Sequence, residues 1–178
     1  MATIETLEDL FLDEIRDLYD AERQLTKALP KMAKAASSDD LRNAFESHLS
    51  ETQKQVQRLE EIFSQLAQKP GGKKCEAMKG LISEGDASAG NVDDDAVRDA
   101  GLIASAQKVE HYEISGYGSA RTHASMLGYV EAVALLEQTL KEEKNADRKL
   151  NDLAETRINE EALKSESAGP RTRTAGSH

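Results

Sequence analysis

The sequence has few of the residues on which disulfide-linked, zinc-binding or membrane-spanning proteins depend. It holds one cysteine, Cys75, so no disulfide can form within the chain. No Cys-x-x-Cys pair or Cys/His cluster is present to hold zinc. No apolar run approaches the ~20 residues that a helix needs to cross a membrane. These absences exclude three common classes of protein.

Basic residues are also in deficit, which limits the choice of partners. The formal net charge is −10 and the isoelectric point is near 4.9. An acidic surface repels the phosphate backbone, so we expect no nucleic-acid binding, whereas a cationic partner is favoured. The first residues carry Glu5 and Glu8 and no basic, apolar leader, so we expect a cytoplasmic protein.

What the sequence does contain favours helix. Ala, Leu, Glu, Lys and Asp are abundant, and their side chains lose little rotamer freedom in helices. Apolar residues recur every three or four positions in four long segments, and the length of 178 residues suits one domain. We therefore predict helices over 7–36, 39–68, 95–126 and 129–163. Pro30 should kink the first helix or loosen one turn of it.

The connections between these segments predict the topology. Two of them are short, whereas 73–94 is long and contains a short helix around 77–82, followed by a loop rich in Gly, Ser, Asn and Asp over 85–94. We expect an all-α, ferritin-like four-helix bundle of two helical hairpins joined by a long crossover, spanning residues 1–163. Residues 164–178 lack apolar periodicity, which predicts a disordered C-terminal tail.

An internal repeat supports two related hairpins. A shift of 91 residues aligns Leu18 with Val109, Phe45 with Leu136 and Leu59 with Leu150. Such coincidences are common between amphipathic helices, but the same shift also aligns one inward-facing glutamate, Glu22, with another, Glu113. The repeat therefore indicates that the two halves place carboxylates at the same level.

Several acidic residues fall on the apolar faces of these helices. Glu22 lies between Leu18 and Leu25, and three further carboxylates take similar positions on the third and fourth helices, with Asp147 one turn beyond the last: Glu110, Glu113 and Glu143. A buried carboxylate costs several kcal/mol unless it is paired, protonated or bound to a cation. Oxygen ligands favour iron or manganese over zinc or copper, so the pattern predicts such a metal site.

The second helix offers a weaker ligand. Glu51 lies at the edge of the apolar stripe, and His48 and Gln55 share its side of the helix. We expect His48, Gln55 and Tyr117 to support the ligands, although His48 is an alternative ligand. A salt-bridge role for the inward glutamates, with Lys54, Lys108 or Lys144, remains the alternative to metal binding.

Three strings resemble the YciF/YciE family of bacterial ferritin-like proteins associated with stress responses. They are LEDLFLDEIRDLYDAE at 7–22, VEHYEISGYG at 109–118 and TLKEEKNAD at 139–147, and the resemblance covers about residues 3–163. It implies a four-helix ferritin-like domain, a homodimer and a di-iron centre whose activity is poorly defined.

The wider rubrerythrin-like pattern places a Glu on one helix and Glu-x-x-His on the next, twice over. By resemblance, Glu22 and Glu51 form the first half and Glu113 and Glu143 the second, with Glu110 as an extra carboxylate. The sequence departs at both histidines, where it has Lys54 and Ala146. His48, Gln55 and Asp147 are the residues that could take their place.

Two functions follow from these observations. The first is a di-iron or di-manganese protein with oxidase or peroxide-handling chemistry, in which carboxylates bridge two metals. The second is a non-catalytic helical dimer that serves as an interaction or structural protein in the stress response. A DNA-coating role is disfavoured by the acidic charge.

Overall fold

Four long helices account for most of the computed structural model, which describes residues 3–167. They are α1 (Leu7–Ala35), α2 (Asp39–Gln65), α4 (Asp95–Met126) and α5 (Val130–Leu153). A shorter helix, α3 (Glu76–Gly90), lies in the crossover, and a π-helical turn (Ala154–Ile158) leads into α6 (Asn159–Ser167). The all-α prediction is confirmed. None of the helices in the described range is long and apolar enough to cross a membrane.

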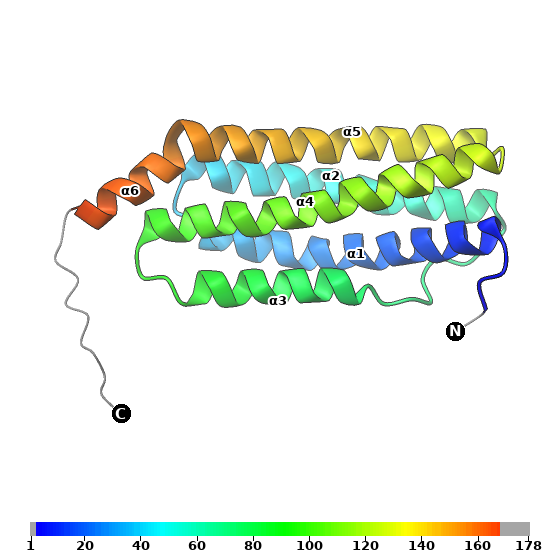
Figure 1. The fold of residues 1–178 in the computed structure, drawn as a ribbon, viewed down its shortest axis with the longest axis horizontal. Coiled ribbons are helices and arrows are strands. Elements are labelled where there is room, and N and C mark those ends of the chain that lie inside the picture. Colours follow the sequence, from blue (N-terminus) through cyan, green and yellow to red (C-terminus); the bar gives the residue numbers. More distant parts are fainter. Residues whose placement is uncertain (1–2, 168–178) are drawn as a thin grey trace, which may run out of the picture.

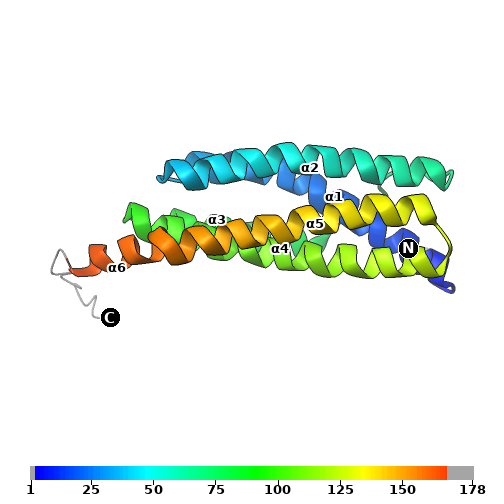
Figure 2. The ribbon, with the colours of Figure 1, turned by 90° about the horizontal axis from the view of Figure 1, so that it is seen from above.

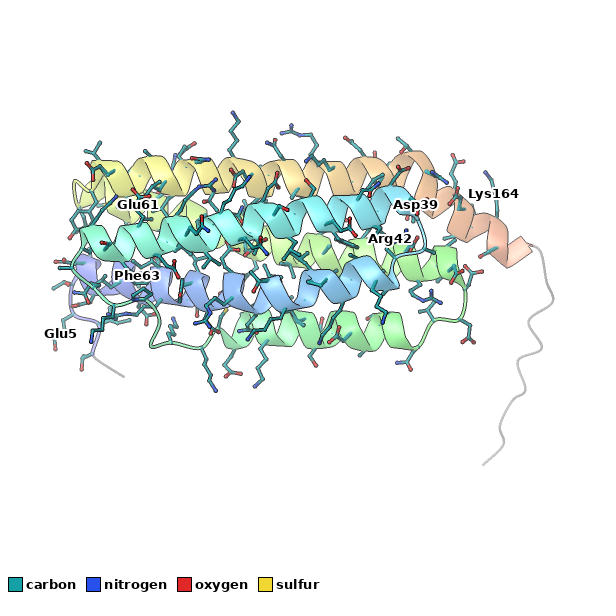
Figure 3. The ribbon with its side chains drawn as sticks, turned by 180° about the vertical axis from the view of Figure 1, so that it is seen from behind. Glu5, Asp39, Arg42, Glu61, Phe63 and Lys164 are labelled. Carbon is teal, nitrogen blue, oxygen red and sulfur yellow. The ribbon has the colours of Figure 1, made fainter. Side chains whose placement is uncertain are left out.

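Side-chain caps fix where the long helices begin. The Thr6 hydroxyl accepts a hydrogen bond from the Asp9 amide at 3.0 Å, and the Asp9 carboxylate accepts one from the Thr6 amide at 3.0 Å. Asp94 caps α4 by accepting from the Val97 amide at 3.0 Å. These bonds satisfy amides that have no partner within the helix. At the start of α2, Arg42 pairs with Asp39 at 2.5 Å (Figure 3).

The chain forms two helical hairpins, α1–α2 and α4–α5, as expected (Figure 1). The crossover helix α3 lies alongside α1 and α4 and runs in the same direction as α1. Seen from above, α2 lies on one side of the bundle and α4 and α5 on the other (Figure 2). After the π-helical turn, α6 bends away from the line of α5 and extends past the end of the bundle (Figure 1).

Two local predictions differ from the structure. The segment expected to be a loop over 85–94 is helical as far as Gly90, because Leu81 and Ile82 pack on the core and Gly85 lies close to Ser105. The last helix does not stop at residue 163 but reaches Ser167, after the π-helical turn. The remaining predicted tail, 168–178, lies outside the described residues. The α1 helix continues through Pro30 to Ala35.

Two apolar clusters fill the interior, and a polar layer separates them. Leu25, Phe45 and Leu150 belong to one cluster, and Leu18, Leu59 and Leu140 belong to the other. On each long helix at least one buried polar residue lies between members of the two clusters, and together these residues form the polar layer: Glu22, His48, Thr52, Gln55, Glu110, Glu113 and Glu143. The fold therefore encloses a polar layer inside an otherwise apolar core.

Candidate metal centre

Each long helix contributes at least one ionisable side chain to the polar layer. Glu22 comes from α1, His48 from α2, Glu143 from α5, and α4 supplies both Glu110 and Glu113. Their exposed fractions are 0% for Glu22, Glu113 and Glu143, 2% for Glu110 and 6% for His48. Four carboxylates and one imidazole are thus enclosed together.

Four of these residues converge on one point. One ligand atom from each of His48, Glu110, Glu113 and Glu143 lies within 4.8 Å of all the others. The His48 Nε2 atom lies 3.3 Å from Glu110 Oε1 and 3.7 Å from Glu143 Oε2. Such spacing allows all four to reach a single cation.

Glu22 faces the same group from α1. Its charge interacts with Glu110 and Glu113, and its Oε1 accepts a hydrogen bond from the Tyr117 hydroxyl. Because this bond occupies one oxygen, the other, Oε2, is the atom that remains for a cation. Glu22 and Glu113, the pair aligned by the repeat, thus meet on opposite hairpins.

Glu143 is oriented by neighbours from α2. Gln55 donates from Nε2 to Glu143 Oε1 and also to Glu142 Oε2, at 3.2 Å from the latter. Arg58 binds both oxygens of Glu142, at 2.6 and 2.7 Å, and donates to the Thr139 hydroxyl at 3.1 Å. This Arg58–Glu142 pair closes the layer on the α2–α5 side and holds Gln55 against Glu143.

Many polar atoms of the layer have no hydrogen-bond partner among the described residues. They are Glu22 Oε2, both His48 nitrogens, Thr52 Oγ1, Gln55 Oε1, Glu110 Oε2, both Glu113 oxygens and Glu143 Oε2. Buried polar groups are normally paired, because leaving one unpaired costs about 1–3 kcal/mol and more for a charge. Carboxylate oxygens and imidazole nitrogen are ligands that suit iron and manganese. The residues present therefore fit a divalent metal.

Burial and mutual repulsion dominate the electrostatics. Burial raises the pKa of Glu22 to about 8, against the opposing effect of the Tyr117 hydroxyl. Burial and neighbouring carboxylates also raise the pKa of Glu113 and of Glu143 well above the ordinary range. Burial lowers the pKa of His48, but Glu110 and the other carboxylates outweigh it and raise the pKa well above normal. Without a cation, the layer therefore tends to hold protons.

Two further candidates from the sequence lie at the margin. The Glu51 side chain is 30% exposed, with Oε2 3.6 Å from His48 Nδ1, so it contacts the outer side of His48. The Asp147 side chain is 26% exposed and lies 3.3 Å from His111 Nε2. The structure brings Glu22, Glu110, Glu113 and Glu143 together and leaves Glu51 and Asp147 outside the convergent group.

The histidine that α2 contributes is not at the position that the rubrerythrin-like pattern predicts. The expected histidine position on α2 is the exposed Lys54, whereas His48 lies one turn before Glu51 and points inward. At the other expected position, Ala146 is 7% exposed and offers no ligand atom. The Arg58–Glu142 pair was not predicted from the sequence, although Arg58 follows Gln55 by three residues on one helical face.

The fold and this polar layer define a ferritin-like four-helix bundle with a carboxylate-rich interior. A ferritin-like domain in a two-domain protein from Anabaena variabilis shares the fold, with a TM-score of 0.55 and 17% identity over 98% of this chain and 42% of that one. A family model described as a domain of unknown function, DUF892, matches residues 6–163. The chain belongs to this family, which includes protein YciF of Escherichia coli.

Two relatives are similar over nearly their whole length. Protein YciF of Escherichia coli K12 is 47% identical over 160 residues, which are 89% of this chain and 96% of that protein. The crystal structure of this stress protein has a TM-score of 0.84 over 88% of this chain and 99% of that one. YcfI from Rhodopseudomonas palustris is 51% identical, with a TM-score of 0.81 over 83% and 94% of the two chains.

Proposed function

We propose that this protein binds two divalent cations, iron or manganese, in the polar layer and uses them in oxidase or peroxide-handling chemistry under stress. The observation that carries this proposal is the set of buried carboxylate oxygens without partners, above all both oxygens of Glu113. Four carboxylates carry a charge that two divalent cations neutralise, with His48 as a neutral ligand. One cation alone would leave charge uncompensated in the core.

Some side chains of the polar layer would hold the cations, and others would orient these ligands. Glu113 has both oxygens available and has Glu22, Glu110 and Glu143 around it, so these four carboxylates would hold the cations together. Tyr117 and Gln55 hold one oxygen each of Glu22 and Glu143, which orients the other oxygen inward. Bound iron would supply electrons for the reduction of dioxygen or peroxide. The apolar clusters on either side exclude bulk water from the layer.

The similarity to a stress protein supports the proposed setting, since YciF of Escherichia coli is described by that term. We also propose that the chain acts in the cytoplasm as a homodimer, in keeping with the family resemblance. Sedimentation velocity at micromolar concentration should give twice the mass of one chain. A monomer at every concentration would contradict the dimer and leave the metal proposal unaffected.

Metal analysis tests the proposal directly. Protein purified without chelator and loaded anaerobically with Fe(II) should hold about two ions per chain and release protons as they bind. The double variant Glu22→Gln and Glu113→Gln should lose this uptake, whereas Asp147→Asn, at the exposed margin, should keep it. Uptake that is absent, or unchanged in the double variant, would overturn the metal site.

The chemistry needs a second measurement. The iron-loaded protein should consume hydrogen peroxide faster than free Fe(II) at the same concentration, and Asp147→Asn should match the unmodified protein. If two ions bind and peroxide consumption does not exceed that of free Fe(II), the protein is a metal-binding protein without this activity.

A further inference from the structure

A cavity of about 410 Å³ lies between α1, α3 and α4, outside the polar layer. It forms a groove beside α3. Its walls are mainly apolar, with Leu25, Ala28, Met32, Leu81, Ile82 and Leu102 among the lining residues. A volume of this size falls within the range of roughly 300–1,000 Å³ that is typical of small-molecule sites. Figure 1 shows α3 beside α1 along this part of the bundle.

The sequence of α3 explains why the space is open. Gly85 faces α4 so closely that an added Cβ would lie 3.3 Å from the Ser105 Cβ, so α3 packs tightly on α4. Along the same stretch the α3 residues that line the cavity include Ala89, which has only a methyl side chain, and Gly90, which has none. The gap towards α1 therefore stays unfilled.

The cavity has a basic end and an apolar end. Lys31 and Lys34 lie on the last turns of α1, and Arg98 lies on the first turn of α4, beside the end of α3. At the opposite end the lining is Leu25, Leu81 and Val109, without a charged group. Such an arrangement suits an elongated molecule with one charged head.

The lysines are available for a ligand. Within the described part of the chain, Lys31 and Lys34 make no hydrogen bond or ion pair. Arg98 is held by Asp95 at 2.7 Å and by the Val92 carbonyl at 3.2 Å, so it contributes charge more than a free donor. Asp86 is the carboxylate of the lining. Because Arg98 is paired with Asp95, the positive charge that the lining offers to a ligand comes mainly from Lys31 and Lys34, on a protein of net charge −10.

We propose that this groove binds a long-chain carboxylic acid. Its carboxylate lies at Lys31 and Lys34, and its hydrocarbon chain runs towards Leu25 and Val109. Burial of the chain supplies the affinity, because each methylene removed from water favours binding, and the lysines select the charged head. A wholly apolar ligand would leave both lysines unused, and a polar anion would not fill the apolar end.

Displacement of a fluorescent apolar probe by laurate or by dodecanol tests the head-group preference. One molecule of laurate should bind per chain, and it should bind more tightly than dodecanol. The double variant Lys31→Glu and Lys34→Glu should weaken laurate roughly tenfold, by the loss of two partly exposed ion pairs, and leave dodecanol unchanged. The control Lys27→Glu and Lys141→Glu carries the same charge change outside the groove and should bind laurate as before.

Filling the groove tests its location. Ala89→Phe should abolish the binding of both compounds, whereas Ala87→Phe, on the exposed face of the same helix, should not; far-ultraviolet circular dichroism checks that both variants fold. Binding should persist in Glu113→Gln, which separates this site from the metal centre. Equal affinity for laurate and dodecanol, or laurate binding untouched by Ala89→Phe, would overturn the proposal. The proposal would also be overturned if laurate does not bind and the chain instead self-associates through this groove, so that Ala89→Phe abolishes the self-association.

Discussion

Among the buried carboxylates of the described residues, Glu113 is the one with no hydrogen-bond partner for either oxygen. It is fully buried, both its oxygens lack a partner, and three other glutamates surround it. A charge in such a place is tolerated only with a proton or a cation, because burial favours the neutral form. At the scale of single residues, therefore, metal and protons compete for the same oxygens.

This competition predicts how the metal-free protein responds to pH. The pKa of Glu22 is about 8 in the folded protein against an ordinary value of 4.5, so the folded state binds the extra proton between these values. Stability is then greatest below the unfolded pKa and is lost as pH rises through the folded one, at up to roughly 1.4 kcal/mol per pH unit for each such group.

Urea unfolding of the chelator-treated protein between pH 6 and 9 measures this effect. We expect stability to fall with pH in the metal-free protein, to fall less in Glu22→Gln, and to fall little once Mn(II) is bound. A metal-free protein whose stability stays constant or rises over this range would show that these carboxylates are already compensated.

Tyr117 offers a second test at the same scale. Its hydroxyl donates to Glu22, so Tyr117→Phe frees that carboxylate to turn away from the other ligands. We expect metal affinity to fall roughly 10–100-fold, as is typical when a residue that orients a ligand is lost. Titration calorimetry with Mn(II) measures the affinity.

Tyr129→Phe serves as the control for Tyr117→Phe. Its hydroxyl donates to the exposed Glu8 at 2.8 Å, far along the chain from the polar layer. This variant should bind Mn(II) as the unmodified protein does. Equal affinities for the two variants and the unmodified protein would show that Tyr117 does not orient a ligand.

At the scale of elements, one buried side chain ties the two hairpins together. The Asp99 carboxylate on α4 accepts hydrogen bonds from the Ser37 and Ser38 amides, at 2.9 and 2.7 Å, and from the Ser37 hydroxyl at 2.8 Å. Ser37 and Ser38 form the turn between α1 and α2. The bonds therefore anchor the α1–α2 turn on the start of α4.

Asp99→Ala should destabilise the protein by roughly 2–4 kcal/mol, because two partly buried amides lose a charged acceptor. Urea unfolding measures the loss, and Asp86→Ala, an exposed aspartate on α3, should change stability by less than about 0.5 kcal/mol. A loss of under about 1 kcal/mol for Asp99→Ala would show that water replaces the carboxylate without cost.

The sequence predicted the elements well where apolar residues recur regularly and poorly where packing decides. The four long helices and the inward glutamates Glu22, Glu113 and Glu143 follow from helical periodicity alone. The α3 helix extends past its predicted end because contact with α4 outweighs the low helix propensity of its glycines. Propensity could not reveal that contact.

Residues at the edge of a helical face were harder to place. Whether Glu51 or His48 turns inward depends on how α2 is rotated against its neighbours, which the spacing along one helix does not fix. The Arg58–Glu142 pair joins α2 to α5, so only the assembled bundle reveals it. Asp147 shows the same limit on α5, since it lies at the edge of the inward face and contacts His111 instead of the polar layer.

At the scale of the whole molecule, the bundle encloses a polar layer between two apolar clusters and carries a separate groove under the crossover helix. The layer is buried on every side by long helices, whereas the groove opens beside α3. The two sites are proposed to bind ligands of opposite charge, a divalent cation inside and a carboxylate at the lysines outside.

The central claim is that the buried glutamates and His48 gather around cations. Anomalous diffraction from crystals grown with Mn(II), recorded on the long-wavelength side of the iron edge, locates such ions directly. We predict two peaks roughly 3.5–4 Å apart among Glu22, His48, Glu110, Glu113 and Glu143, the separation usual for two-metal sites. A map at saturating Mn(II) with no peak among these residues, and peaks only at exposed carboxylates, would contradict the account.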